Sequence, residues 1–151
     1  MVDPDTTPVV ARTRAQWVTV TMHGYSGTPL PQKLGLKPGL KVYVDGAPDH
    51  LDELLGGSTY TTRLPREIDV TLLFSASLAR LKQRLPVVIE RTVSNGMVWA
   101  CWPKKASKVP TDLDENVVRD LGLAAGVVDV KVAAVEATWS GLKLVRRLED
   151  R

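Results

Sequence analysis

The chain has 151 residues, which is the length of one ordinary domain and too few for two domains with separate cores. Apolar residues make up 44% and charged residues 25%, the composition of a folded globular protein, and no apolar run approaches the ~20 residues of a membrane-spanning helix. The net charge of +3 and the single cysteine, Cys101, exclude a strongly basic tail and a disulfide framework.

The first 21 residues differ from the rest of the chain. They carry scattered Thr and Pro and only a brief β-like run, whereas Met22 opens a segment dense in turn-forming residues. We expect residues 1–21 to be a flexible N-terminal extension and residues 22–151 to form a single domain. Because no basic segment followed by an apolar stretch marks a signal peptide, we expect the protein in the cytoplasm.

Short helices and strands alternate along the first half of the domain. Residues 33–36 predict a helical turn, residues 41–45 a β-branched and aromatic strand, and residues 49–55 a short helix with acidic residues in its first turn. Residues 58–63 indicate a weaker, Thr-rich strand. Residues 68–74 form a nearly continuous apolar run, typical of a strand that is buried on both faces.

The middle of the chain continues the alternation. Ser77 is placed to cap a helix whose leucines recur at helical spacing, and Pro86 either kinks that helix or begins a second one. Asn95-Gly96 predicts a turn into another apolar strand at residues 97–102.

The last third predicts a helix and a hairpin. Thr111 or Asp112 is expected to cap the helix, residues 127–135 form a long β run, residues 139–141 turn the chain, and residues 142–148 return as a strand. The whole pattern predicts an α/β fold of three layers, with a mostly parallel sheet that ends in an antiparallel hairpin.

Several motifs carry a resemblance to known families. Leu-Gly-Leu-Lys-Pro-Gly at residues 34–39, followed by a strand and Gly46, resembles the opening of the Rossmann-like methyltransferases, which use a glycine-rich loop for S-adenosylmethionine. Gly-Tyr-Ser-Gly-Thr-Pro-Leu at residues 24–30, Trp-Pro-Lys-Lys at 102–105 and Thr-Trp-Ser-Gly-Leu-Lys at 138–143 resemble a bacterial family defined as a domain of unknown function. The resemblance implies a reduced Rossmann-like, methyltransferase-like fold, but no established activity.

The sequence departs from a working methyltransferase in the residues that hold the cofactor. The loop after the first strand keeps one glycine, Gly46, and Pro48 removes a backbone N–H that a ligand could use. Residues 60–63 supply no acid where members of that group hold the ribose hydroxyls, and residues 55–68 leave room for only one strand. We therefore predict that the chain uses no cofactor, with S-adenosylmethionine as the disfavoured alternative.

A candidate ligand site lies where strands end. Two lysines after the strand at residues 97–102, together with a helix N-terminus at Thr111 or Asp112, could hold an anion, and Trp139 folded towards Trp102 would add a cleft for a ring. The alternative is that Trp102 packs on the hairpin and the lysines are solvated. His50 is interpreted as a surface residue. The candidate site comprises Asp45, Gly46, Ala47, Pro48, Trp102, Lys104, Lys105 and Trp139.

These observations favour a non-catalytic methyltransferase-like domain that binds a small anionic ligand or a protein partner. No catalytic triad, metal-ligand spacing or paired carboxylates indicate an enzyme. One alternative is an atypical S-adenosylmethionine-dependent methyltransferase. A second is an RNA-associated accessory protein, although nucleic acid is not the expected partner and no membrane association is predicted.

Overall fold

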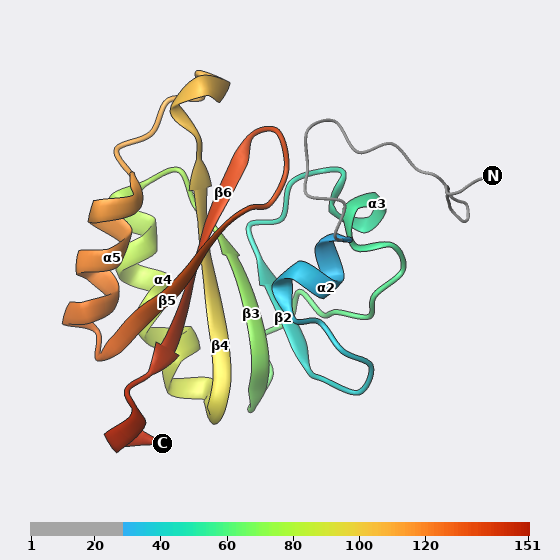
Figure 1. The fold of residues 1–151 in the computed structure, drawn as a ribbon, viewed down its shortest axis with the longest axis vertical. Coiled ribbons are helices and arrows are strands. Elements are labelled where there is room, and N and C mark those ends of the chain that lie inside the picture. Colours follow the sequence, from blue (N-terminus) through green and yellow to red (C-terminus); the bar gives the residue numbers. More distant parts are fainter. Residues whose placement is uncertain (1–28) are drawn as a thin grey trace.

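The computed structural model describes residues 29–151 (Figure 1). The predicted extension at residues 1–21 lies outside the described residues, as does most of the motif at residues 24–30. Within the described part, the chain forms one sheet with helices on both faces, which confirms the predicted three-layer α/β fold.

The sheet has the strand order β2-β3-β4-β6-β5. The first three strands are parallel, and β6 then runs antiparallel to both β4 and β5. The sheet is therefore mostly parallel up to a closing hairpin, as the sequence predicts. The strands are β2 (Val42–Asp45), β3 (Ile68–Phe74), β4 (Thr92–Pro103), β5 (Val127–Ala134) and β6 (Trp139–Arg146).

Two helices cover each face of the sheet (Figure 1). Figure 1 shows α4 and α5 on one side and the much shorter α2 and α3 on the other. Single 3₁₀ turns, η1 and η2, follow β4 and β6. The helical elements are α2 (Leu30–Leu34), α3 (Leu51–Leu55), α4 (Leu78–Arg91), η1 (Lys105–Ser107), α5 (Glu115–Ala124) and η2 (Leu148–Asp150).

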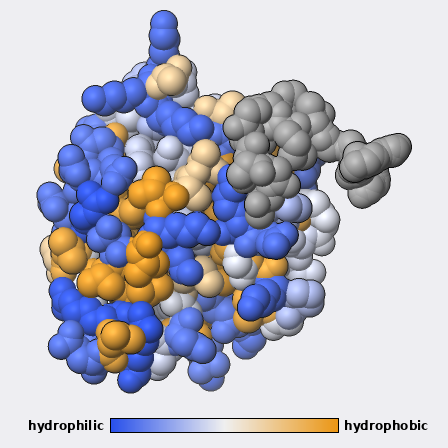
Figure 2. All heavy atoms as spheres, in the orientation of Figure 1, coloured by the Kyte–Doolittle hydropathy of each residue, from blue (hydrophilic) through white to orange (hydrophobic). Residues whose placement is uncertain are grey.

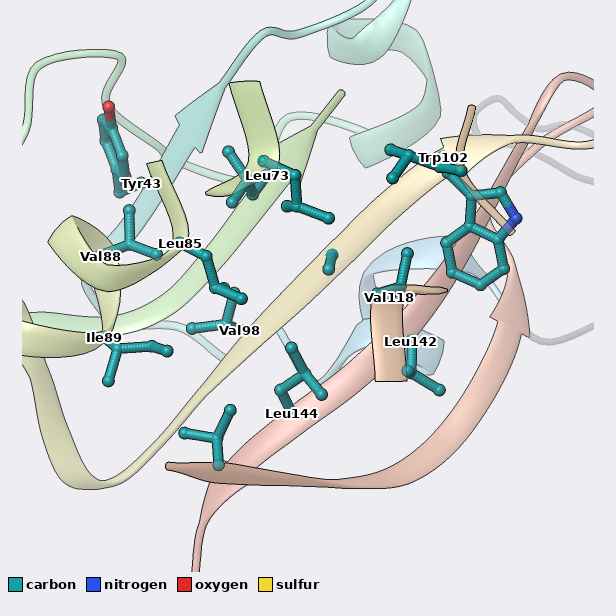
Figure 3. Close-up of a cluster of buried hydrophobic side chains, with 14 of the residues drawn as sticks. Tyr43, Leu73, Leu85, Val88, Ile89, Val98, Trp102, Val118, Leu142 and Leu144 are labelled. Atoms are coloured by element: carbon teal, nitrogen blue, oxygen red, sulfur yellow. The ribbon is translucent and has the colours of Figure 1, made fainter. Parts of the chain in front are cut away.

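The layer of α4 and α5 holds the larger helices. Apolar residues of α4 at helical spacing, such as Leu85, meet side chains of β3, β4 and β6. Trp102 belongs to this cluster, beside Val118 of α5 and Leu142 of β6 (Figure 3). Burial of each such aliphatic side chain contributes about 1.5–3 kcal/mol, so this layer stabilises the sheet strongly.

The layer of α2 and α3 is built around Trp99, which points to the opposite face from Trp102. The indole Nε1–H of Trp99 donates a hydrogen bond of 3.0 Å to the carbonyl oxygen of Leu34 at the end of α2. Phe74 and Trp139 meet edge to face in the same layer, with ring centroids 5.2 Å apart. The hydrogen bond holds α2 against the sheet, and Leu51 and Leu55 of α3 are buried in the same cluster.

The predicted strand at residues 58–63 is wrong. Only Thr61 pairs with β2, through backbone hydrogen bonds of 2.9 Å to Val42 and Val44. Among the described residues no strand lies beyond Thr61, so nothing supports its outer edge and the pairing does not extend.

Pro86 neither ends α4 nor starts a second helix. The helix continues from Leu78 to Arg91 with Pro86 inside it. Leu81 and Leu85 before the proline and Val88 and Ile89 after it are all buried. One apolar stripe therefore packs on the sheet along the whole helix, and its burial outweighs the backbone hydrogen bond that the proline removes.

The predicted turn at Asn95-Gly96 lies inside β4. The pairing of β4 with β3 changes register there, between Ile68 and Val70. A Cβ atom at Gly96 would lie 2.8 Å from the carbonyl oxygen of Asp69. The glycine thus allows a close approach of two strands at an irregularity, not a reversal of the chain.

The last helix and the hairpin are both displaced from their predicted boundaries. The cap of α5 is Asp114, whose carboxylate accepts from the N–H of Val117 at 2.9 Å. Thr111 and Asp112 instead tie the preceding loop to the start of α4. Trp139 already belongs to β6, so the chain reverses at residues 135–138 and not at residues 139–141.

The surface is mostly polar, but apolar side chains lie on the side of α5 and β5 (Figure 2). The most exposed large apolar residues include Leu123 on α5, Val130 and Val132 on β5, and Leu148. Within residues 29–151, none of the helices has the length and apolar character needed to span a membrane.

Candidate ligand site at the carboxyl edge of the sheet

The carboxyl ends of β2, β3 and β4 meet at one edge of the sheet because the three strands are parallel. The loop between β5 and β6 lies at the same edge, since Trp139 pairs with Pro103 (Figure 1). Open α/β sheets bind ligands outside this edge. We therefore refer to it as the carboxyl edge and describe its polar groups in turn.

Asp45 ends β2 at this edge and is held by two arginines of α4. Its carboxylate accepts from the Nε–H of Arg84 at 2.7 Å and from the guanidinium of Arg80. Arg84 also donates to the hydroxyl of Tyr43 at 3.0 Å, and that hydroxyl lies 3.3 Å from Asp45. We call these four residues the Asp45 cluster.

The Asp45 cluster keeps its carboxylate charged. Burial alone would raise the pKa of Asp45, but the hydrogen bonds from Arg84 and Arg80 and their positive charge outweigh burial and lower it below 3.8. The same contact with Asp45 raises the pKa of Arg84. At neutral pH the cluster is thus a carboxylate with two cations, and the arginine side chains remain about a third exposed.

Gly46 brings the β2 loop against the end of β3. Its φ of +73° is in the left-handed region, and a Cβ atom would lie 2.4 Å from the carbonyl oxygen of Phe74. Arg80 donates to that same carbonyl oxygen at 2.8 Å. Ala47 is exposed and Pro48 half-buried in the loop that follows. The guanidinium of Arg80 therefore stands between the ends of β2 and β3.

The structure does not bring the two candidate tryptophans together. Trp102 is buried beside Val118 of α5 and Leu142 of β6 (Figure 3), whereas Trp139 packs against Phe74 in the layer of α2 and α3. The pairing of Trp102 with Ser140 explains this result, because neighbouring residues of a strand point to opposite faces. The expected cleft between two indoles is not formed.

Lys104 and Lys105 lie in the loop after β4, as the sequence predicts. Lys104 is half-buried and donates its backbone N–H to the carbonyl oxygen of Thr138 at 2.8 Å, while Lys105 is exposed. The helix that follows begins at Glu115, and Asp114 caps it. Two carboxylates occupy that N-terminus, so it does not supply the expected partner for an anion.

One polar pair at the carboxyl edge is not predicted from the sequence. His50, in the loop before α3, places its Nε2 atom 2.7 Å from the Oε2 atom of Glu136. Glu136 lies in the loop between β5 and β6 and is 7% exposed. The two residues are 86 positions apart. No local pattern signals their contact, because only the closing hairpin brings Glu136 to this edge.

Comparison with known proteins supports the fold. The chain is similar to the magnesium protoporphyrin IX methyltransferase of Synechocystis PCC 6803 with bound S-adenosylhomocysteine, at 11% identity, 78% coverage of each chain and a TM-score of 0.53. It is similar to a putative type 11 methyltransferase of Sulfolobus solfataricus, at 18% identity, coverage of 78% and 89%, and a TM-score of 0.54. A methyltransferase of Aquifex aeolicus, described as dependent on S-adenosylmethionine, gives 13% identity, coverage of 75% and 85%, and a TM-score of 0.52.

These neighbours bear on the predicted fold and on the predicted absence of a cofactor. They show a methyltransferase-like fold, as the sequence predicts. The prediction of no cofactor is contradicted, because the Synechocystis enzyme was solved both with S-adenosylhomocysteine and with S-adenosylmethionine. Neither a protein-family model nor a curated protein matches the sequence, so the narrower family resemblance stays a prediction.

Proposed function

We propose that this chain binds S-adenosylmethionine or its demethylated product at the carboxyl edge, as an atypical methyltransferase-like domain. The observation that carries the proposal is the Asp45 cluster, a carboxylate and two guanidinium groups at the end of β2 in a methyltransferase-like fold. Its position follows the general rule for ligands on open α/β sheets.

The Asp45 cluster fits the amino-acid end of such a ligand. That end carries one ammonium and one carboxylate group, and the cluster presents the opposite charges. The carboxylate of Asp45 would receive the ammonium group, and the half-exposed Arg80 would pair with the ligand carboxylate. Gly46 allows the backbone to stay close to this point.

The ribose of the ligand would meet different residues from those that the resemblance implies. Residues 60–63 carry no acid, and β2 is the last strand on that side of the described sheet. We therefore assign the specificity of the site to the amino-acid end. When bound, S-adenosylmethionine supplies an electrophilic methyl group; the chain's own residues orient it through Asp45 and Arg80.

Calorimetric titration with three ligands tests the proposal. We expect S-adenosylhomocysteine to bind, and to bind at least as tightly as S-adenosylmethionine, because the sulfonium charge is repelled by Arg80 and Arg84. We expect 5′-methylthioadenosine, which lacks the amino-acid end, to bind at least about tenfold more weakly, a loss of about 1.4 kcal/mol.

Matched variants locate the site. Asp45→Asn and Arg80→Gln should each weaken S-adenosylhomocysteine by about tenfold or more and leave 5′-methylthioadenosine unchanged. Lys82→Gln is the control, because Lys82 is exposed on the same helix. Absence of binding at millimolar S-adenosylhomocysteine contradicts the proposal. Equal binding by all variants contradicts the assignment to the Asp45 cluster.

A further inference from the structure

The sheet face that carries α2 and α3 is only partly covered within residues 29–151. In the paired row of Trp99, Lys143 and Lys131, exposure increases from β4 through β6 to β5. The end of α2 lies over Trp99, whose indole N–H bonds to Leu34. Towards β5 this cover ends, because Val130 and Lys131 are exposed. A sheet face of this kind is normally buried against another layer.

The same face forms a shallow depression near the amino end of β4. Its volume is about 280 Å³, and Met97 of β4, Val145 of β6 and Val130 of β5 supply its apolar lining. Lys143 and Arg151 are the charged residues in the lining. Sites for small molecules usually measure about 300–1,000 Å³ and enclose the ligand. This smaller depression, open at the exposed Val130, suits one protruding side chain better than a whole ligand.

Two lysines beside the depression face each other across the hairpin. Lys131 of β5 pairs directly with Lys143 of β6. Like charges in such a pair destabilise a sheet, because the two Cβ atoms are only about 4.5–5.5 Å apart. Among residues 29–151 neither ammonium group forms an ion pair with an acid. An acid brought by another molecule would relieve this repulsion.

The complementary groups lie next to the depression, on η2. Leu148 is 80% exposed, more than any other large apolar residue of the described part, and Asp150 is exposed beside it. η2 comes directly after β6 (Figure 1), and Arg151, which follows η2, lines the depression. Leu148 does not line the depression of its own chain. One chain therefore carries, side by side, an apolar depression with two lysines and an exposed leucine with an acid.

We propose that the depression, the two lysines and η2 form the interface of a symmetric dimer between two copies of this chain. In a two-fold interface each patch meets its counterpart on the other copy, so adjacent complementary patches are satisfied twice. Leu148 of each copy fills the depression of the other, and Asp150 lies against the partner's Lys143. The same contact covers the exposed leucine and compensates the paired lysines.

A second copy is favoured over a different protein because one chain carries both halves of the contact. The interface lies near the amino end of β4, whereas the carboxyl edge lies at the other end of the parallel strands. The inference therefore stands apart from the proposed function and needs no ligand. Because the depression is shallow and the charged groups are few, we expect a reversible dimer with a dissociation constant of about 100 μM or less.

Sedimentation equilibrium of the full chain tests the dimer at concentrations from about 1 μM to about 1 mM. We expect the average mass to rise from one chain towards two. Leu148→Ala removes an apolar contact that occurs twice in the dimer, so it should weaken association at least about tenfold. Val109→Ala is the matched control, because Val109 is 40% exposed in the loop before α5, outside the interface.

Charge reversal identifies the residues that meet across the interface. Lys143→Glu places an acid opposite Asp150 of the other copy, and Asp150→Lys places a lysine opposite Lys143, so each variant alone should associate at least about tenfold more weakly than the wild type. An equimolar mixture of the two variants should form a heterodimer, because both contacts are then attractive. Lys105→Glu, an exposed lysine after β4, is the control and should leave association unchanged.

Circular dichroism first establishes that each variant is folded, which is expected because Leu148 and Asp150 are exposed. Four results overturn the proposal. They are a wild-type chain that stays monomeric up to about 1 mM, a mass that rises past two chains, equal effects of Leu148→Ala and Val109→Ala, and a mixture of the charge variants that associates no better than either alone. A dimer that is weakened by Leu148→Ala and restored by mixing supports it.

Discussion

Two buried carboxylates stand at the same edge of the sheet, one in each helical layer, and different cations hold them. Asp45 meets the guanidinium groups of Arg80 and Arg84, whose charge is permanent, whereas Glu136 meets the imidazole of His50. The first arrangement fixes a charge pattern that does not vary with pH near neutrality. The second engages one nitrogen of the imidazole, Nε2, and no bond to the other is found among residues 29–151.

The two carboxylates differ in the chemistry of the cation that holds them. Guanidinium groups suit recognition of a carboxylate, because they stay charged and donate in a fixed geometry. An imidazole held by a carboxylate suits proton transfer, because it can change charge without moving. The fold thus places a carboxylate with two guanidinium groups on the α4 side of the edge and a carboxylate with one imidazole on the α3 side.

The largest effect on stability is expected at Gly46, where the loop after β2 lies close to Phe74 and Arg80. Gly46→Ala places a Cβ atom 2.4 Å from the carbonyl oxygen of Phe74, and φ is +73°. We expect a loss of about 3 kcal/mol in the free energy of unfolding, measured with urea. Gly57→Ala is the control, since Gly57 has a φ of +89° but nothing within 4 Å. Equal losses would show that no close contact exists at Gly46.

The next largest effect is expected for Asp45→Asn. The variant leaves Arg80 and Arg84 side by side without a negative charge between them. We expect a loss of about 2 kcal/mol in the free energy of unfolding. This value is smaller than for a fully buried pair because both arginine side chains reach solvent. Urea unfolding at neutral pH measures it, with Asp52→Asn on exposed α3 as the control. A loss no larger than that of the control would mean that the cluster is solvated and does not organise the edge.

The sequence predicts the fold better than the site, and particular residues explain why. The strand at Ile68–Phe74 is predicted with its observed boundaries, because an uninterrupted apolar run needs burial on both faces. The order of strands and helices along the chain is also predicted from local sequence patterns. The position of Asp45 at the end of a strand is predicted in the same way, from the short β-branched and aromatic run before it.

The missed features depend on contacts that are distant in sequence. The pairing of Arg80 with Asp45 requires α4 to lie over β2, and that of His50 with Glu136 requires the closing hairpin. Trp102 and Trp139 each end near the carboxyl edge, but the side-chain alternation of paired strands sends them to opposite layers. The register between two strands depends on both of them, so neither segment predicts it alone.

The two carboxylates are expected to lose their contribution to stability at different pH values. Both have a lowered pKa in the folded state, so each contributes stability that is present above its ordinary pKa and lost as pH falls through the folded value. For Glu136 that loss falls below pH 4.5, and for Asp45 below pH 3.8. We expect Glu136→Gln to be less stable than the wild type by about 1 kcal/mol at pH 6, with the difference shrinking below pH 4.5.

Unfolding in urea at a series of pH values measures this contrast. Glu149→Gln, an exposed acid near the C-terminus, controls for the removal of any one carboxylate. A difference between wild type and Glu136→Gln that stays constant down to pH 3 would mean that Glu136 is not ionised in the folded protein.

The smallest effect is expected at Tyr43, whose hydroxyl joins Arg84 to Asp45. Tyr43→Phe keeps the buried ring and removes only that hydroxyl, so we expect a loss of about 0.5 kcal/mol in the free energy of unfolding. Tyr60→Phe is the control, because its hydroxyl bonds to the exposed Asp52 and should contribute little. If Tyr43→Phe is neutral, the two arginines hold Asp45 without help. The α4 side of the edge would then resemble the α3 side, with one carboxylate and its cations and no wider network.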